Sequence, residues 1–245
     1  MSQYNPSFIN IQLNHHTLYV YSVRKLLHES LDKHLNKFKG TLLDLGCGEM
    51  PYRQYILDKN KKVTKYIGVD VNFNKVHQLI KPDLYWDGHK IKLKENSIDT
   101  VIATELFEHI PNIGEVLAEI YRILKPSGLL YLTVPFIWPL HEVPYDEFRY
   151  TPYSLERFIA QAKFKNILIH PIGCIHSSLA QILCIWISTT RKTFSSKTKK
   201  IIFSFIEKVF FYPLIKLLLK YDKKIRHTSF SNNGMFTGFS VNATK

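Results

Sequence analysis

Short apolar runs alternate with helical patterns along most of the chain. Apolar runs typical of buried strands occupy residues 41–45, 66–71, 84–88, 98–103, 129–135 and 164–172, and residues 235–244 alternate as a further strand would. Within residues 17–38 and 112–124, apolar side chains recur every three or four positions, as one face of a helix requires. This alternation predicts an α/β fold with a parallel, doubly wound sheet. In such a sheet the ligand lies beyond the carboxyl ends of the strands.

Composition agrees with a folded domain in a reducing compartment. The 245 residues, 45% of them hydrophobic, are enough for one α/β domain and an added segment. The three cysteines, Cys47, Cys174 and Cys184, have neither an even count nor C-x-x-C spacing, so neither a disulfide framework nor a zinc site is expected. Residues 1–14 lack a basic stretch followed by an apolar run, so no secretory signal is expected.

A glycine turn follows the first predicted strand. Gly46 and Gly48 stand one residue apart, which predicts a tight turn whose backbone can approach a ligand closely. Pro51 occupies the place of the third glycine in the dehydrogenase G-x-G-x-x-G loop, and the Gly-Lys-Ser/Thr of a phosphate-binding P-loop is absent. What remains, with Asp44 two residues before the first glycine, resembles motif I of the class I S-adenosylmethionine-dependent methyltransferases. An ordinary strand-to-helix turn is the alternative.

Further motifs carry the same resemblance through the chain. Residues 96–111 resemble the family's pattern around strand four, and Leu-Lys-Pro-Ser-Gly-Leu-Leu at 124–130 resembles its turn into strand five. The resemblance implies a Rossmann-like, seven-stranded methyltransferase sheet over residues 41–173 and 234–245, with its last strand antiparallel. It also implies that residues 1–40 form a helical segment over the cofactor site and that residues 174–233 are a helical insertion between strands six and seven.

The implied cofactor is S-adenosylmethionine, and its expected binding residues are Asp44, Gly46, Gly48, Asp70, Asp87 and Glu105. Asp70 ends the second predicted strand, where a carboxylate can accept hydrogen bonds from both hydroxyls of a ribose. A helix cap after the strand is the alternative. Asp87 ends the third predicted strand and resembles the acidic residue that pairs with the adenine amino group.

Methyl transfer requires a positioned nucleophile, and an oxygen nucleophile also requires a base. His109 after strand four and His141 after strand five are the candidate catalytic residues, although His109 could instead shape its loop. Tyr145 and Arg149 in the loop of residues 135–152 are candidate substrate contacts, and Arg149 could clamp a phosphate or carboxylate. In the same loop, Phe148 and Tyr150 are expected to be core anchors, and Thr151 is expected to cap a helix that begins at Pro152.

The run Glu105-Leu-Phe-Glu108-His109 also resembles the metal-binding motif of small-RNA 2′-O-methyltransferases and ubiquinone-type O-methyltransferases. In those families a further histidine completes the site, and His141 stands where such a ligand could be. Relatives also carry the Glu-His pair without metal. We predict no metal.

The run of residues 141–151 resembles a signature of bacterial methyltransferases that act in cell-surface polysaccharide and glycoconjugate pathways. The resemblance implies a small-molecule or glycan acceptor that contains a sugar or is linked to a lipid.

Basic charge is concentrated near the end of the chain. The net charge is +13, and residues 191–226 hold eleven Lys and Arg against Glu207 and Asp222, or +9. Residues 174–190 carry no Lys, Arg, Asp or Glu, and residues 201–219 are strongly apolar, but neither stretch predicts a confident transmembrane helix. On a helix, Lys200, Ser204, Glu207, Lys208, Lys216 and Lys220 would form one narrow polar stripe beside a wide apolar face.

Such a face with basic edges predicts a peripheral membrane segment at the inner, cytoplasmic face of an anionic membrane. A helical hairpin that packs on the core or in a dimer is the alternative. We expect an O-methyltransferase and no nucleic-acid partner, because aromatic residues for stacking in a polar groove are not evident. An RNA methyltransferase and a non-catalytic module with a cofactor fold remain the competing hypotheses.

Overall fold

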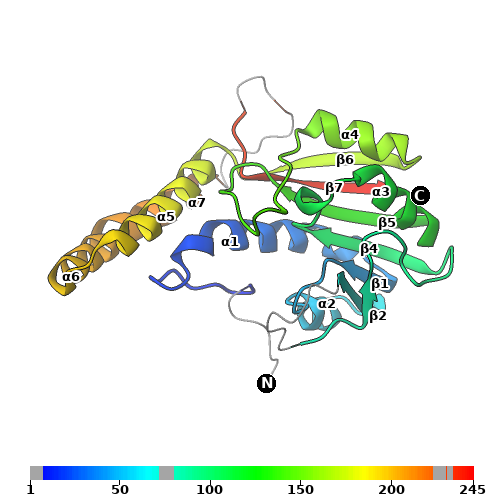
Figure 1. Cartoon of the computed structure of the whole chain (residues 1–245), viewed down its shortest axis with the longest axis horizontal. Coiled ribbons are helices and arrows are strands. Elements are labelled where there is room, and N and C mark those ends of the chain that lie inside the picture. The colour runs from blue at the N-terminus through cyan, green and yellow to red at the C-terminus, as the bar shows by residue number, and fades with distance from the viewer. Residues whose placement is uncertain (1–7, 72–79, 223–229, 231–233) are drawn as a thin grey trace. The chain divides into compact units, whose positions relative to one another are not determined.

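The computed structural model describes residues 8–71, 80–222, 230 and 234–245 (Figure 1). These residues fall into two compact units. The first unit contains Ser30–His170 and Gly238–Lys245, and the second contains residues 8–29 and Pro171–Thr237. Helix α1 (Leu18–His34) contributes residues to both units, and a short 3₁₀ helix, η1 (Leu35–Lys37), follows it.

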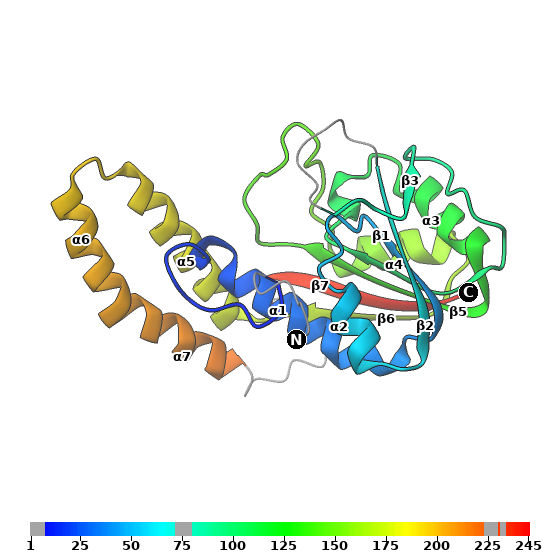
Figure 2. The same cartoon turned by 90° about the horizontal axis from the view of Figure 1, so that it is seen from below.

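A seven-stranded sheet organises the first unit (Figures 1 and 2). Its strands are β1 (Gly40–Leu45), β2 (Val63–Val71), β3 (Leu84–Trp86), β4 (Ile98–Thr104), β5 (Leu124–Pro135), β6 (Lys165–Ile172) and β7 (Gly238–Thr244). They are arranged in the order β3-β2-β1-β4-β5-β7-β6. Strands β1 to β5 pair in parallel, whereas β7 runs antiparallel to β5. The predicted seven-stranded fold with an antiparallel last strand is therefore confirmed.

The central strands form the core of the first unit. Leu42, Leu43, Val101 and Leu130 are completely buried, as expected when both faces of a parallel sheet are covered. Helix α3 (Ile113–Ile123) turns Val116, Leu117, Ile120 and Ile123 inward. Burial of each such side chain stabilises the fold by about 1.5–3 kcal/mol.

Helix boundaries follow local sequence signals in most places. The Thr151 hydroxyl accepts a hydrogen bond of 3.3 Å from the Ser154 N–H at the start of α4 (Pro152–Gln161), so the predicted cap is confirmed. Helix α2 (Arg53–Lys59) begins two residues after Pro51, which lies in the turn before it. The prediction for Phe148 is wrong: its side chain is 37% exposed and stacks on the buried Tyr150 ring.

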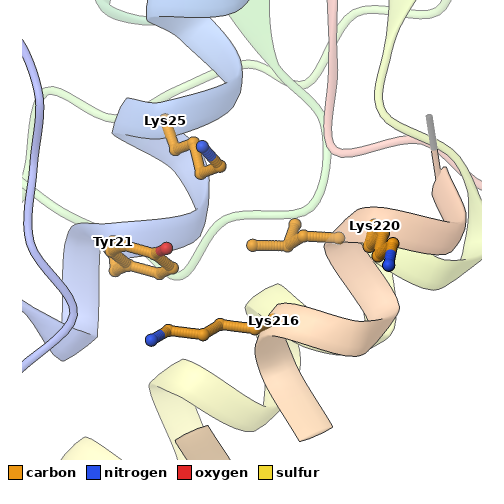
Figure 3. A pocket seen from close by; sticks show the side chains of 5 residues that line it. Tyr21, Lys25, Lys216 and Lys220 are labelled. Carbon is orange, nitrogen blue, oxygen red and sulfur yellow. The ribbon is translucent and has the colours of Figure 1, made fainter. Parts of the chain in front are cut away.

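The second unit has its own hydrophobic core. It includes α5 (Ile175–Thr193), α6 (Lys197–Ile206), the π-helical turn η3 (Glu207–Phe211) and α7 (Tyr212–Asp222). Its buried side chains are Leu18, Tyr21, Leu26, Ile172, Ala180, Cys184, Ile187, Ile215 and Leu219. A pocket opens where α1 and α7 face each other (Figure 3). None of the helices within the described ranges is long and apolar enough to cross a membrane.

Glu207 is predicted to lie on the polar stripe, but it is buried in the structure. Glu207 is completely buried and accepts a hydrogen bond of 2.7 Å from the Arg191 guanidinium of α5. A buried carboxylate needs such a partner, because desolvation of an unpaired charge is costly. The stripe therefore lacks its only acidic residue, which instead joins two helices of the unit.

Candidate active site

The glycine turn between β1 and α2 depends on its backbone conformation. Gly46 has a φ of +73°, and a Cβ placed there would lie 2.8 Å from the Cδ1 of Leu106. Gly48 has a φ of +49°, and a Cβ there would meet no atom within 4 Å. Gly46 is thus required by packing as well as by conformation, while Gly48 leaves open space beside the turn.

Asp70 joins the end of β2 to this turn. Its two carboxylate oxygens accept hydrogen bonds from the N–H of Gly48, at 2.6 Å, and from its neighbour Val71, at 2.7 Å. Burial raises the pKa of this carboxyl group, and the two N–H groups oppose that effect. Each oxygen can accept a further hydrogen bond, so the carboxylate could still bind a diol.

Two carboxyl groups near the strand ends have oxygens without hydrogen-bond partners. Asp44 in β1 accepts a hydrogen bond from the Tyr66 hydroxyl through Oδ2, but its buried Oδ1 has no partner among the described residues. Glu105 follows β4 with a φ of +50°, and its buried Oε1 is likewise unpartnered. Burial raises the pKa of each carboxyl group to about 7. Such groups are suited to a ligand that brings positive charge or N–H donors.

Asp87 has a structural role in the turn after β3. Its Oδ1 accepts hydrogen bonds from the N–H groups of His89, at 2.9 Å, and Lys90, at 2.8 Å. These bonds lower the pKa of the exposed carboxyl group. The expected adenine contact stays a prediction, and a further acceptor site on the carboxylate remains for it.

The two candidate catalytic histidines lie against each other. Their ring centroids are 4.8 Å apart in an edge-to-face arrangement. His109 Nδ1 is 3.0 Å from the carbonyl oxygen of Tyr145, and His141 Nδ1 is 3.0 Å from Oδ2 of Asp146. Because a carbonyl and an ionised carboxylate can only accept, each neutral imidazole carries its proton on Nδ1. The lone pair of each ring is therefore on Nε2.

Arg149 holds the acidic partner of His141 in place. Its guanidinium donates to both oxygens of Asp146, at 2.6 and 2.8 Å, and to the carbonyl oxygens of Trp138 and Phe148. This pairing holds the pKa of Asp146 well below its usual range, so Asp146 is ionised. The predicted role of Arg149 as a substrate clamp is untested, and its donors already bind the loop. Tyr145 is exposed and could contact an acceptor.

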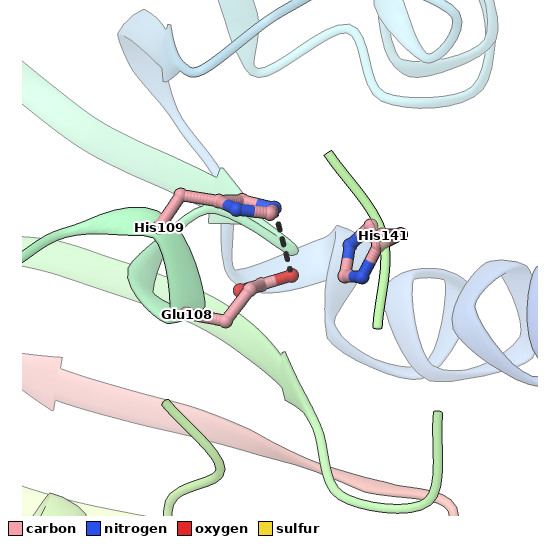
Figure 4. A group of neighbouring side chains, drawn as sticks. All are labelled: Glu108, His109 and His141. Atoms are coloured by element: carbon pink, nitrogen blue, oxygen red, sulfur yellow. Dashed lines mark ion pairs between the residues drawn. The ribbon is translucent and has the colours of Figure 1, made fainter. Parts of the chain in front are cut away.

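Glu108 lies beside His109 and is a buried carboxyl group. The side chain is completely buried, and neither carboxyl oxygen has a hydrogen-bond partner within the described ranges. Its Oε1 lies 3.7 Å from Nε2 of His109 (Figure 4). Burial, and next the nearby Glu105, raise its pKa well above the usual range. A buried carboxyl group of this kind is neutral unless a cation is bound to it.

Glu108, His109 and His141 could together hold a metal ion, because one ligand atom from each lies within 4.8 Å of the others. Carboxylate and imidazole are ligands for several divalent metals. The prediction that no metal is used stays a prediction.

Sequence reasoning assigned no site role to Asp146, and it named Glu108 only within the run that resembles a metal-binding motif. The Arg149 side chain three positions after Asp146 is a local signal for an ion pair. No local signal distinguishes the buried Glu108 from an exposed glutamate on a turn.

Comparisons with known proteins agree with this geometry. Residues 43–132 match a family model described as a methyltransferase domain. Residues 43–132 therefore resemble a methyltransferase domain. A crystal structure of an S-adenosylmethionine-dependent methyltransferase from Archaeoglobus fulgidus is similar at a TM-score of 0.53 and 18% identity, over 95% of this chain and 100% of that one. The chain thus has the predicted class I fold.

Two curated relatives match part of this chain. A thiol S-methyltransferase from Rattus norvegicus is 28% identical over 99 residues, or 37% of this chain and 41% of the relative. A ubiquinone/menaquinone biosynthesis C-methyltransferase from Paraburkholderia phytofirmans is 34% identical over 102 residues, or 38% of this chain and 42% of the relative. The chain therefore matches about two fifths of either relative's length, and the two relatives' names describe transfer to different atoms.

Proposed function

We propose that the chain transfers the methyl group of S-adenosylmethionine to an oxygen of a sugar-containing or lipid-linked acceptor at the cytoplasmic face of a membrane. The observation that carries the oxygen assignment is the contact of His141 with Asp146. A hydroxyl must lose its proton during the transfer, and this pair supplies an imidazole with a free Nε2. A thiol is more acidic than a hydroxyl, so its methylation depends less on such a base.

The cofactor would be held by the glycine turn and the strand ends. S-adenosylmethionine supplies a methyl group on a positively charged sulfur, together with an ammonium group and a ribose. Asp70 would accept the ribose hydroxyls, and the open space beside Gly48 would admit the cofactor next to the backbone. The unpartnered oxygens of Asp44 and Glu105 suit an ammonium group, because each carboxyl would ionise beside it.

His141 would act as the base. Its Nε2 would take the proton from the acceptor hydroxyl, and the imidazolium formed would be stabilised by Asp146 at Nδ1. Arg149 keeps Asp146 ionised and fixes its position. His109, whose ring lies against that of His141, would accept a second hydroxyl hydrogen bond or serve as an alternative base. The exposed Tyr145 could pack on a sugar ring.

A membrane acceptor is supported by the surface of the second unit. Ile175, Leu179, Ile182 and Trp186 are exposed at helical spacing, so they share one face of α5. Helix α6 and the turn after it expose Ile201, Ile202, Phe205, Ile206, Val209 and Phe210. The apolar face of α6 and the turn after it lies within residues 191–226, which carry the excess of basic residues, and the apolar face of α5 precedes them. An anionic bilayer accounts for both features.

The test of the acceptor class uses S-adenosylmethionine with a labelled methyl group. Lipid-linked saccharides, soluble glycans and RNA would be offered separately to the purified chain. We expect label in the saccharide fraction as a methyl ether that resists alkali, and loss of that label in His141→Asn. Label in RNA alone would contradict the acceptor class, and a methyl thioether product would contradict the oxygen assignment.

The matched control is Glu95→Gln, an exposed carboxylate on a turn of the same unit. This variant should retain wild-type transfer. A chain that binds no S-adenosylmethionine and labels no fraction would support the competing hypothesis of a non-catalytic module.

A further inference from the structure

Basic side chains from two helices line the pocket of the second unit. Tyr21 and Lys25 project from α1, and Lys216, Leu219 and Lys220 project from α7 (Figure 3). The cavity volume is about 300 Å³. This is at the small end of the range for sites that bind small molecules, which is about 300–1,000 Å³.

The charges in this pocket are only partly balanced. The Nζ of Lys25 lies 3.2 Å from Oε1 of Glu29, which stands on the next turn of α1. Within the described ranges, Lys216 and Lys220 have neither an ion pair nor a hydrogen bond. They stand four residues apart on one helix, where like charges destabilise the helix. An anion between α1 and α7 would relieve this repulsion.

The floor of the pocket is apolar and fixed. Tyr21 and Leu219 are buried members of the unit's hydrophobic core. Burial raises the pKa of the Tyr21 hydroxyl, so it remains a hydrogen-bond donor at physiological pH. Figure 3 shows Lys216 reaching from α7 toward Tyr21. The pocket thus combines ammonium groups and a hydroxyl donor with a hydrophobic base.

We propose that the Tyr21–Lys25–Lys216–Lys220 pocket binds a phosphate group that is attached to a partly apolar molecule. A phosphate monoester has several acceptor oxygens and negative charge for the three ammonium groups and the phenol. The attached carbon chain would contact Leu219 and the Tyr21 ring. This proposal deepens the membrane assignment, on which it rests, by naming the group that the second unit recognises.

The first experiment measures binding without a membrane. Calorimetry on the full chain would use dihexanoyl phosphatidic acid below its micelle concentration, and inorganic phosphate as the second probe. Lys216→Gln with Lys220→Gln should weaken binding of the lipid probe by about tenfold or more, because two charge-assisted bonds are lost. Tyr21→Phe should weaken binding by about threefold, since it removes one hydroxyl donor.

The matched control removes the same charge elsewhere in the unit. Lys199→Gln with Lys200→Gln changes two exposed lysines of α6 that do not line the pocket. This control should lower affinity by less than about twofold at 0.15 M salt, because exposed charges beyond about 8 Å are screened. Equal losses of affinity in the two double variants would overturn the proposal. A chain that binds neither probe would also overturn it.

The two probes distinguish the source of the phosphate. Tighter binding of the lipid probe supports the proposed ligand, whereas equal binding of the two probes would identify the free anion and contradict the apolar contact with Leu219 and the Tyr21 ring. Vesicle flotation then separates this proposal from the membrane assignment. Binding of the soluble lipid probe without flotation on anionic vesicles would leave the phosphate pocket standing and remove the membrane assignment.

Discussion

The backbone N–H of Gly48 donates a hydrogen bond of 2.6 Å to the carboxylate of Asp70, which ties the glycine turn to the end of the neighbouring strand. The two residues are 22 positions apart in the sequence. Gly48 lies in the turn after β1, and Asp70 lies near the end of β2. One carboxylate thus holds the turn and faces the place where a parallel sheet binds its ligand.

Asp70→Ala should weaken S-adenosylmethionine binding by about 2 to 4 kcal/mol, because two charge-assisted hydrogen bonds to the ribose are lost. Calorimetry on the purified chain measures the change. Glu95→Gln serves as the control, since it removes an exposed carboxylate that is not part of the site. Unchanged affinity in Asp70→Ala would falsify the ribose role.

Asp44→Asn should make the protein more stable at pH 8 than the wild type, and the difference should shrink toward pH 4. Burial raises the pKa of Asp44 from 3.8 to about 7, so the folded state binds more protons than the unfolded state between these values. Stability therefore falls as pH rises through that window, by about 4 kcal/mol at most for three pKa units.

Chemical denaturation of the cofactor-free chain at several pH values measures this effect. Asparagine can still accept the hydrogen bond from Tyr66 but does not titrate. A stability difference that stays constant with pH would show that Asp44 is ionised without penalty in the folded chain.

Asp146→Asn should lower kcat while leaving KM for the acceptor nearly unchanged, because Asp146 positions His141 and stabilises its charged form. His141→Asn should lower kcat by about 10² to 10⁴.

Arg149→Lys gives a second check on the same pair. It retains the charge beside Asp146 but not the two-pronged geometry, so we expect a smaller loss in kcat than Asp146→Asn causes. An unaltered kcat in Asp146→Asn would exclude the proposed role of Asp146, and equal changes in KM and kcat would indicate a purely structural loop.

Chelation should leave methyl transfer unchanged, because the proposed reaction needs a base and not a metal. Turnover and thermal stability would be measured with and without a chelator, followed by magnesium or manganese. If activity vanished and returned with the metal, Glu108, His109 and His141 would be ligands, as their proximity allows. The cation would also ionise the buried Glu108 carboxyl group.

Phe205→Ser with Phe210→Ser should strongly reduce flotation of the full chain on anionic vesicles. Both rings are largely exposed, at 67% and 60%, and the burial of each in a bilayer would contribute about 1.5–3 kcal/mol. Added salt should weaken the attraction of the basic residues, at about 1 kcal/mol each, while the apolar contribution persists.

Tyr153→Ser is the control for flotation, because this ring is 66% exposed on α4 of the first unit. It should float like the wild type. If the control and the double variant floated equally well, the exposed rings of the second unit would have no part in membrane attachment.

The sequence by itself determined the strand order along the chain, the glycine turn, the cap at Thr151 and the acidic end of β2. Each depends on neighbours within a few positions: periodicity of apolar residues, the conformation that glycine permits, or a hydroxyl three residues from an N–H. Local pattern could therefore predict where the cofactor turn lies and which carboxylate ends the strand beside it.

Only the tertiary structure decided which polar groups are paired, buried or left without partners. Glu207 looked like part of a solvated stripe but is buried against Arg191, and Glu108 is buried without a hydrogen bond. Lys25 and Lys216 are 191 positions apart and line one pocket. Burial and electrostatic partners come from segments that are distant in the chain, so the pKa of a carboxyl group and the occupant of a pocket depend on the packed fold.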